Sequence, residues 1–172
     1  MKNIEFTVSV HIKTSPQTAY EHLANLDNHP GLQPLVVATE ALERGQDAQG
    51  HQTKRFYSIE QFHFLGFIPY KNKIKVLMTL LPEANTIVQE VDSFPNIYLR
   101  SETCFAAADG GTTVTETVII DCPDLLLGYV RKTAVSAHEV LMQNLKARLE
   151  KDLLLKLFET HELIHQTNQL IL

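Results

Sequence analysis

The sequence predicts one α+β domain in which a curved antiparallel sheet wraps around a long C-terminal helix. Three observations predict this arrangement. The chain opens with a strictly alternating strand, its middle carries only strands and turns, and its end keeps helical spacing over several turns. Its 172 residues suit a single domain. A chain of that length buries roughly 70% of its unfolded surface, which is enough to fold without a metal or a disulfide.

The first element is an amphipathic strand over residues 4–12. Its even-numbered positions from Ile4 to Ile12 are apolar and the positions between them are polar, which is the pattern of a strand with one buried face. Ser15 and Pro16 then form an N-cap and a first helical residue. The short helix that they open ends at the breaker Asn28–Gly31.

The middle of the chain forms an antiparallel meander of six strands. Turn signals separate the strands and no helical stretch lies between them, which argues against alternating strand–helix units. The predicted strands cover residues 35–44, 51–63, 71–81, 86–92, 97–107 and 112–121.

A long helix opens at Pro123 and Asp124 and continues past residue 150. Its apolar stripe is Leu127, Val130, Ala134, Ala137, Leu141, Leu145 and Leu149. We divide the chain into a ligand-binding domain over residues 1–152 and a helical extension over 153–172. The extension is rich in leucine, so it packs either on a second subunit, as a homodimer, or back on its own domain.

Composition narrows the classes of function. The formal net charge of −5 argues against nucleic-acid binding, which needs a basic face. Two cysteines suggest no disulfide framework, and no apolar run approaches the ~20 residues that span a bilayer. The first residues show no signal-type apolar core. We therefore expect a cytoplasmic protein with no transmembrane segment and no nucleic-acid partner.

Four segments carry a resemblance to a known family. They are the opening VSVHIKTSPQTAYEHL (8–23), the loop LDNHP (26–30), the hairpin DGGTTVT (109–115) and the ending LKARLE (145–150). Together with the order of elements they resemble the helix-grip fold of the START/birch-allergen (SRPBCC) superfamily, and within it the polyketide cyclase/dehydrase and coenzyme-Q-binding-like branches. The resemblance covers residues 1 to about 150. The last ~20 residues and the absence of tryptophan depart from the usual pattern.

The resemblance implies a curved seven-stranded sheet with two short helices after the first strand. It also implies a cavity between sheet and long helix that holds a lipid, sterol, quinone, polyketide or other apolar molecule. The superfamily shares no catalytic residue set, so none is transferred to this chain. We expect no cofactor.

The turn Asp109–Gly111 sets the register of the last two strands. It places Phe105 opposite Val114, Thr103 opposite Glu116, and Ser101 opposite Val118. A slip by one residue would invert every inner-face assignment. With this register, the candidate ligand-binding residues are Glu116, Thr103, Ser101, His138, Leu99, Phe105, Val118, Phe62, Met78, Leu141 and Leu145.

Glu116 interrupts an otherwise apolar inner row, where a lone carboxylate is costly unless it is hydrogen-bonded or protonated. It either anchors the polar head of a ligand or acts as an acid or base, or else it reaches the rim or an arginine. Glu60 is also a carboxylate that alternates with inward residues on its strand, and the same alternatives apply to it. His138 flanks the stripe of the long helix, where it either points at the ligand or is a hydrogen-bonded wall residue. Arg100 and Glu102 lie on the opposite face in this register, where we expect a surface cross-strand pair.

The connection over residues 62–70 is unusually apolar. Phe67, Ile68 and Tyr70 either form a lid over the cavity, touch a membrane or a partner, or cap the core.

The stretch His161–Glu162–Leu163–Ile164–His165 matches the H-E-x-x-H pattern of zinc proteases. On a helix the two histidines would share a face, so His161 and His165 are weak metal-ligand candidates. A catalytic zinc needs a third protein ligand, and few residues follow His165 in which to supply it.

Three functions follow from these observations. The first is binding or transport of a hydrophobic small molecule without catalysis. The second is a cyclase or dehydratase-like enzyme that uses the same cavity, with Glu116 or His138 as proton shuttle. The third, from a different class, is a zinc hydrolase at His161 and His165.

Overall fold

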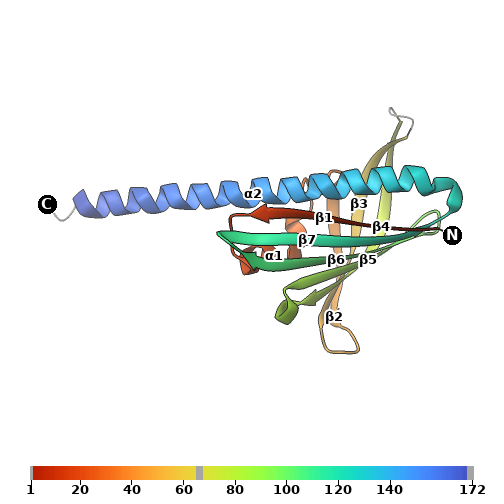
Figure 1. Cartoon of the computed structure of the whole chain (residues 1–172), viewed down its shortest axis with the longest axis horizontal. Coiled ribbons are helices and arrows are strands. Elements are labelled where there is room, and N and C mark those ends of the chain that lie inside the picture. Colours follow the sequence, from red (N-terminus) through yellow and green to blue (C-terminus); the bar gives the residue numbers. More distant parts are fainter. Residues whose placement is uncertain (1, 65–67, 170–172) are drawn as a thin grey trace.

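The computed structural model describes the backbone of residues 2–64 and 68–169, and the side chains of residues 2–61 and 71–151. A curved antiparallel sheet forms one layer and a long helix lies across it (Figure 1). The elements in chain order are β1 (Lys2–Ile12), α1 (Pro16–Ala24), η1 (Leu26–Asn28), β2 (Val36–Gln46), β3 (Gln52–Phe64), β4 (Ile68–Leu81), η2 (Pro82–Ala84), β5 (Thr86–Ser93), β6 (Ile97–Ala108), β7 (Gly111–Cys122), η3 (Asp124–Leu126) and α2 (Leu127–Gln169).

The predicted fold class is confirmed. The seven strands lie in the order β1-β7-β6-β5-β4-β3-β2, so each hairpin from β2 to β7 pairs neighbours in sequence and β1 closes on β7. The short helices α1 and η1 fill the connection from β1 to β2, as predicted. Strand ends agree with the predicted ones within three residues. The largest difference is β4, which begins at Ile68 where the sequence predicted residue 71.

The register of the last hairpin is also as predicted. Phe105 pairs with Val114, Thr103 with Glu116, and Ser101 with Val118. Gly110 in the turn has a φ of +72°, in the left-handed region that favours glycine. A Cβ at Gly111 would collide with the carbonyl group of Ile12, so this turn can fit against the end of β1 only with glycine there. The turn therefore sets which residues of β7 face inward.

The turns of α2 around residues 144–148 are bonded to the rest of the domain. Nη1 of Arg148 donates to the carbonyl of Asn28 at 2.6 Å, and Nδ2 of Asn144 donates to the carbonyl of Leu32 at 2.8 Å. Between these tethers Leu145 is fully buried in the main core. The helix α1 contributes Ala19, Tyr20 and Leu23 to the same core. This end of the space between sheet and helix is therefore filled by side chains.

Beyond that packed region α2 continues as one helix to Gln169 and extends past the edge of the sheet (Figure 1). Its side chains after Lys151 lie outside the described residues. The division of the chain at residue 152 and the homodimer through the extension therefore stay predictions.

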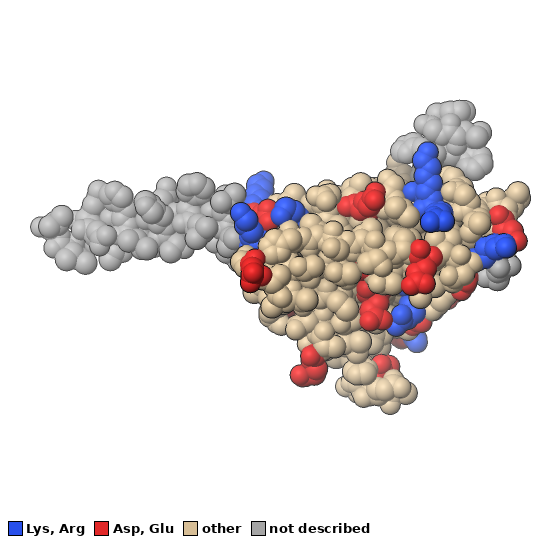
Figure 2. Space-filling view, viewed as in Figure 1, with Lys and Arg blue, Asp and Glu red and all other residues tan. Residues whose placement is uncertain are grey.

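The surface in Figure 2 mixes the two signs of charge: among the described residues on that face, basic and acidic side chains are interspersed without a continuous patch of either. Nη2 of Arg100 lies 3.2 Å from Oε2 of Glu102, so this ion pair forms within β6 and not across strands as expected. Within the described residues, no helix is long and apolar enough to cross a bilayer.

Candidate functional site

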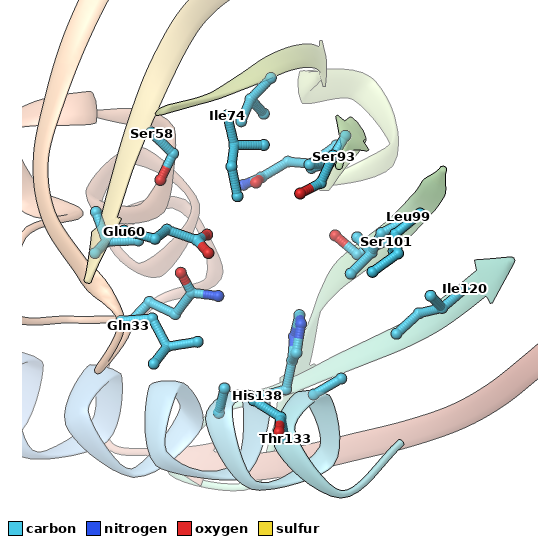
Figure 3. Close-up of a pocket in the computed structure, with 18 of the residues that line it drawn as sticks. Gln33, Ser58, Glu60, Ile74, Ser93, Leu99, Ser101, Ile120, Thr133 and His138 are labelled. Carbon is cyan, nitrogen blue, oxygen red and sulfur yellow. The ribbon is translucent and has the colours of Figure 1, made fainter. Parts of the chain in front are cut away.

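A cavity of about 750 Å³ lies between the inner face of the sheet and the first half of α2 (Figure 3). Its volume falls in the range of pockets that hold small organic ligands. Most of its wall is apolar, including Phe56, Ile74, Val91, Leu99 and Leu141. The turns from Tyr129 to Leu141 pack against β1 and β7 through residues such as Val130 and His138, and they also border the cavity, whereas Asn144 and Arg148 bond the later turns to the segment between α1 and β2.

Polar side chains enter this apolar space from several elements. Ser58 and Glu60 come from β3, Ser101 from β6 and His138 from α2, and Figure 3 shows all four around one hollow. Their positions follow from strand alternation, because inward residues recur at every second position. A few convergent polar groups in a mostly apolar pocket are typical of a ligand site.

Glu116 and His138 form a buried ion pair in the cavity wall. The Nδ1–H of His138 donates to Oε2 of Glu116 at 2.8 Å, and the side chains are 8% and 6% exposed, His138 first. Burial by itself lowers the pKa of His138, but the charge and the hydrogen bond of Glu116, with the charge of Glu60, outweigh burial and raise that pKa. Glu116 therefore favours the protonated form of the His138 ring. Phe6 packs edge-on against the ring, with centroids 5.6 Å apart.

This arrangement leaves one ring nitrogen of His138 for a ligand. Nδ1 is used by Glu116, and the ring itself lines the cavity. Among the described residues Nε2 has no hydrogen-bond partner, so it can meet a bound molecule, and Glu116 borders the cavity as well. The other polar group of interest is Glu60, whose carboxylate points into the hollow (Figure 3).

Glu60 has no hydrogen-bond partner among the described residues. Burial raises its pKa from 4.5 to about 7, and the charge of His138 opposes that rise only in part. The carboxyl is therefore close to half ionised at neutral pH. An ionisable group in this state, without a protein partner and facing a cavity, indicates a functional site.

The structure divides the predicted ligand-binding residues into two groups. Those that line the cavity are Glu116, Ser101, His138, Leu99 and Leu141. Those that do not line it but are buried in the packing around it are Thr103, Phe105, Val118, Met78 and Leu145.

The second group has a common physical explanation. Phe105, Met78 and Leu145 lie in the main core, where α1 and the tethered turns of α2 fill the space. Val118 belongs to a smaller core cluster with Ile4 and the start of α2. Alternation thus predicts which residues of the sheet face inward. Whether an inward residue borders the cavity depends on how closely α2 and α1 pack at that position.

Several cavity residues were missed by the sequence reasoning. Asn72 and Ser93 are inward-facing polar residues near the ends of β4 and β5, and Gln33 comes from the segment before β2. Asn72 lies in phase with Ile74, so alternation on β4 could have indicated it. Phe94 and Tyr129 border the cavity and are 83% and 62% exposed. They lie at a turn and at a helix start, where periodicity gives no signal.

Some predictions fall outside the described side chains. Phe62, the apolar connection over 62–70 with its expected lid, and the histidines His161 and His165 are among them. Within the described part of the chain, no group of three or more His, Cys, Asp and Glu is placed to hold a metal ion. The zinc hypothesis is therefore not tested at the motif that suggested it.

Comparisons with known proteins agree with the fold. The family model "Polyketide cyclase / dehydrase and lipid transport" matches residues 3–150. Among curated proteins none matches.

Solved structures share the fold at low identity. A protein from Thermus thermophilus is 16% identical, with a TM-score of 0.66, and the match covers 87% of this chain and 99% of the Thermus chain. The Zhui aromatase/cyclase from Streptomyces is 15% identical, with a TM-score of 0.65, covering 88% and 96%. A START superfamily protein from Mycobacterium smegmatis is 14% identical, with a TM-score of 0.63, covering 86% and 97%. Because the family model spans residues 3–150, this protein belongs to the polyketide cyclase/dehydrase and lipid transport family.

Proposed function

We propose that the protein binds a hydrophobic small molecule in the cavity between the sheet and α2, and carries it without transforming it. The observation that supports this proposal is the cavity itself, about 750 Å³ of space with a mostly apolar wall. A packed domain leaves few voids larger than a water molecule, so a hollow of this size needs an occupant to explain it.

Apolar burial supplies the binding energy in this proposal. A ligand that buries about 250 Å² of apolar surface gains about 6 kcal/mol, before the costs of association are subtracted. Orientation comes from the polar groups, chiefly Glu60, Ser101 and the free Nε2 of His138. Exchange with the outside would pass Phe94 and Tyr129, which border the cavity and are exposed.

A cavity-filling substitution tests the proposal. Leu141→Trp places an indole in the cavity wall, and we expect it to weaken binding of the neutral dye Nile red at least 10-fold. Leu42→Trp is the matched control, because Leu42 is on β2, 47% exposed and not part of the cavity wall. The chain has no tryptophan, so each variant also carries a single fluorescent reporter. Ala134→Trp, earlier on the same helix, repeats the test if Leu141→Trp fails to fold. Unchanged dye binding in both blocked variants would refute the proposal.

One observation favours a second function, a cyclase or dehydratase-like enzyme. Nε2 of His138 has no hydrogen-bond partner among the described residues, and Glu116 stabilises the protonated ring, which is the arrangement of a general base held by a carboxylate. When the ring is neutral, Nε2 could remove a proton from carbon beside a carbonyl group. The electrons of that C–H bond would form a C=C bond, and the β-hydroxyl would leave with a proton as water.

The bound molecule distinguishes the two functions. Mass spectrometry of molecules extracted from the wild type and from His138→Phe should give the same compound if the protein is a carrier. A dehydratase would leave the variant holding a compound heavier by one water molecule.

A further inference from the structure

The polar groups of the cavity are arranged in a row that begins at Glu60. In the sheet Glu60 pairs with Asn72 of β4, and Nδ2 of Asn72 donates to Oγ of Ser93 on β5 at 3.3 Å. Gln33 lines the same hollow, as does Ser58, which lies two residues before Glu60 on β3 (Figure 3). The row gives a bound molecule several neutral hydrogen-bonding groups and one carboxyl that lacks a partner in the described protein.

The ionisable groups that face Glu60 come from three other elements. His138 of α2 and Glu116 of β7 are in contact with each other at 2.8 Å. His29, from the segment before β2, bonds through Nε2 to the carbonyl of Leu23. Burial lowers the pKa of His29, which disfavours a positive charge on that ring. A cation is therefore disfavoured at His29, and a cation at His138 is already in contact with Glu116.

Lysine and arginine are absent from the cavity wall among the described residues. Lys71 and Lys73 flank Asn72 on β4, but both are exposed, and Lys73 pairs with Glu40 at 2.6 Å. A buried ligand anion would thus lose its hydration without gaining an unpaired cation as partner. It would also be repelled by the Glu60 carboxyl group whenever that group is ionised. A hydrogen-bond donor, by contrast, would give Glu60 the partner that it lacks.

We propose that the cavity selects an apolar molecule whose polar end is an uncharged hydroxyl group, which donates to Glu60, and that it excludes molecules ending in a carboxylate or phosphate. The inference rests on the proposed function and specifies its ligand class. In this arrangement the apolar body lies against α2 and β5–β7, and the hydroxyl end lies against β3 and β4.

Three probes with one apolar body separate the contributions: 1-pyrenemethanol, its methyl ether, and pyrene-1-carboxylate. Each displaces Nile red from the wild type, from Glu60→Leu and from Glu60→Gln at pH 6 and pH 8. In the wild type at pH 8 we expect the alcohol to bind about 10-fold tighter than the ether, the size of one hydrogen bond to a charged acceptor. The carboxylate should bind at least 10-fold weaker than the ether.

The variants show whether Glu60 is the acceptor. In Glu60→Leu the preference for the alcohol over the ether should vanish, with binding of the ether retained. Glu60→Gln keeps an acceptor oxygen, so part of the preference should survive. In the wild type the preference should grow from pH 6 to pH 8, because the ionised carboxylate is the stronger acceptor. In Glu60→Leu it should not change with pH.

Each failure has its own meaning. Carboxylate binding as tight as alcohol binding, or an alcohol preference that persists in Glu60→Leu, overturns the ligand class while the carrier function stands. If none of the three probes displaces the dye from any form of the protein, the proposed function itself fails.

Discussion

Replacing Glu60 by glutamine should stabilise the folded protein at pH 8. Burial raises the pKa of Glu60 from 4.5 to about 7. A carboxyl whose pKa is higher in the folded state contributes its full stability below pH 4.5 and loses that contribution as the pH rises to about 7. At about 1.4 kcal/mol per pKa unit, ionising Glu60 costs the fold on the order of 3 kcal/mol at pH 8. Glutamine keeps the shape without the charge, so most of this cost should be recovered.

Urea denaturation between pH 5 and pH 8 measures the effect. The variant should exceed the wild type by about 2–3 kcal/mol in free energy of unfolding at pH 8, and the gain should shrink as the pH falls towards 4.5. Glu5→Gln is the control, since Glu5 is an exposed carboxylate on β1, and its effect should stay within about 0.5 kcal/mol. Parallel pH profiles for Glu60→Gln and the wild type would refute the reasoning, because they would mean that Glu60 ionises as easily in the folded protein as in the unfolded chain.

Four further substitutions test the surrounding structure. His138→Phe should cost about 3–5 kcal/mol by leaving Glu116 buried without a partner, whereas adding Glu116→Leu should recover much of that loss; additive losses in the double-mutant cycle would contradict the ion pair. Because Glu116 helps to raise the pKa of His138, the stability that the pair contributes should decline as the pH rises above about 6.5, which the same denaturation series detects. Tyr20→Phe should stabilise the protein by about 1 kcal/mol, since the Tyr20 hydroxyl is buried without a hydrogen-bond partner among the described residues, and a measured loss would mean that the hydroxyl is bonded. Arg148→Met should lower the free energy of unfolding by about 1–3 kcal/mol through loss of the bond to the carbonyl of Asn28, and an unchanged value would show that this tether does not hold α2.

Alternation and turn chemistry were sufficient to predict the sheet. The Asp109–Gly111 turn allowed the β6–β7 register to be predicted, and from it the inward position of Glu116 followed. Glu116 could then be recognised as a buried carboxylate in need of a partner.

That partner could not be identified from the sequence. His138 follows Glu116 by 22 residues, on a helix whose rotation against the sheet is set by tertiary contacts. The pattern on α2 placed His138 beside the inward stripe, but the contact with Glu116 depends on how α2 crosses β1 and β7. Sequence reasoning therefore named both residues of the pair and did not predict that they meet.

The position of the cavity along the sheet likewise could not be predicted from the sequence. Leu141 and Leu145 occupy equivalent places in the apolar stripe, yet Leu141 borders the hollow and Leu145 is fully buried in the core. Asn144 and Arg148 bond the later turns of α2 to backbone carbonyls of the segment between α1 and β2, and Leu145, which lies between them, packs in the core with side chains of α1. Periodicity identifies an apolar face, but it does not show how far that face stands from its neighbour.

Methyl NMR during titration with 1-pyrenemethanol tests most directly whether a ligand occupies the space between sheet and α2. The account predicts that the largest shifts fall on methyl groups of the cavity wall, such as Val91, Leu99 and Leu141. The exposed methyl groups of Val37 and Leu42 should stay unchanged. Shifts confined to the exposed residues, or a saturated complex with no shift in the cavity wall, would contradict it.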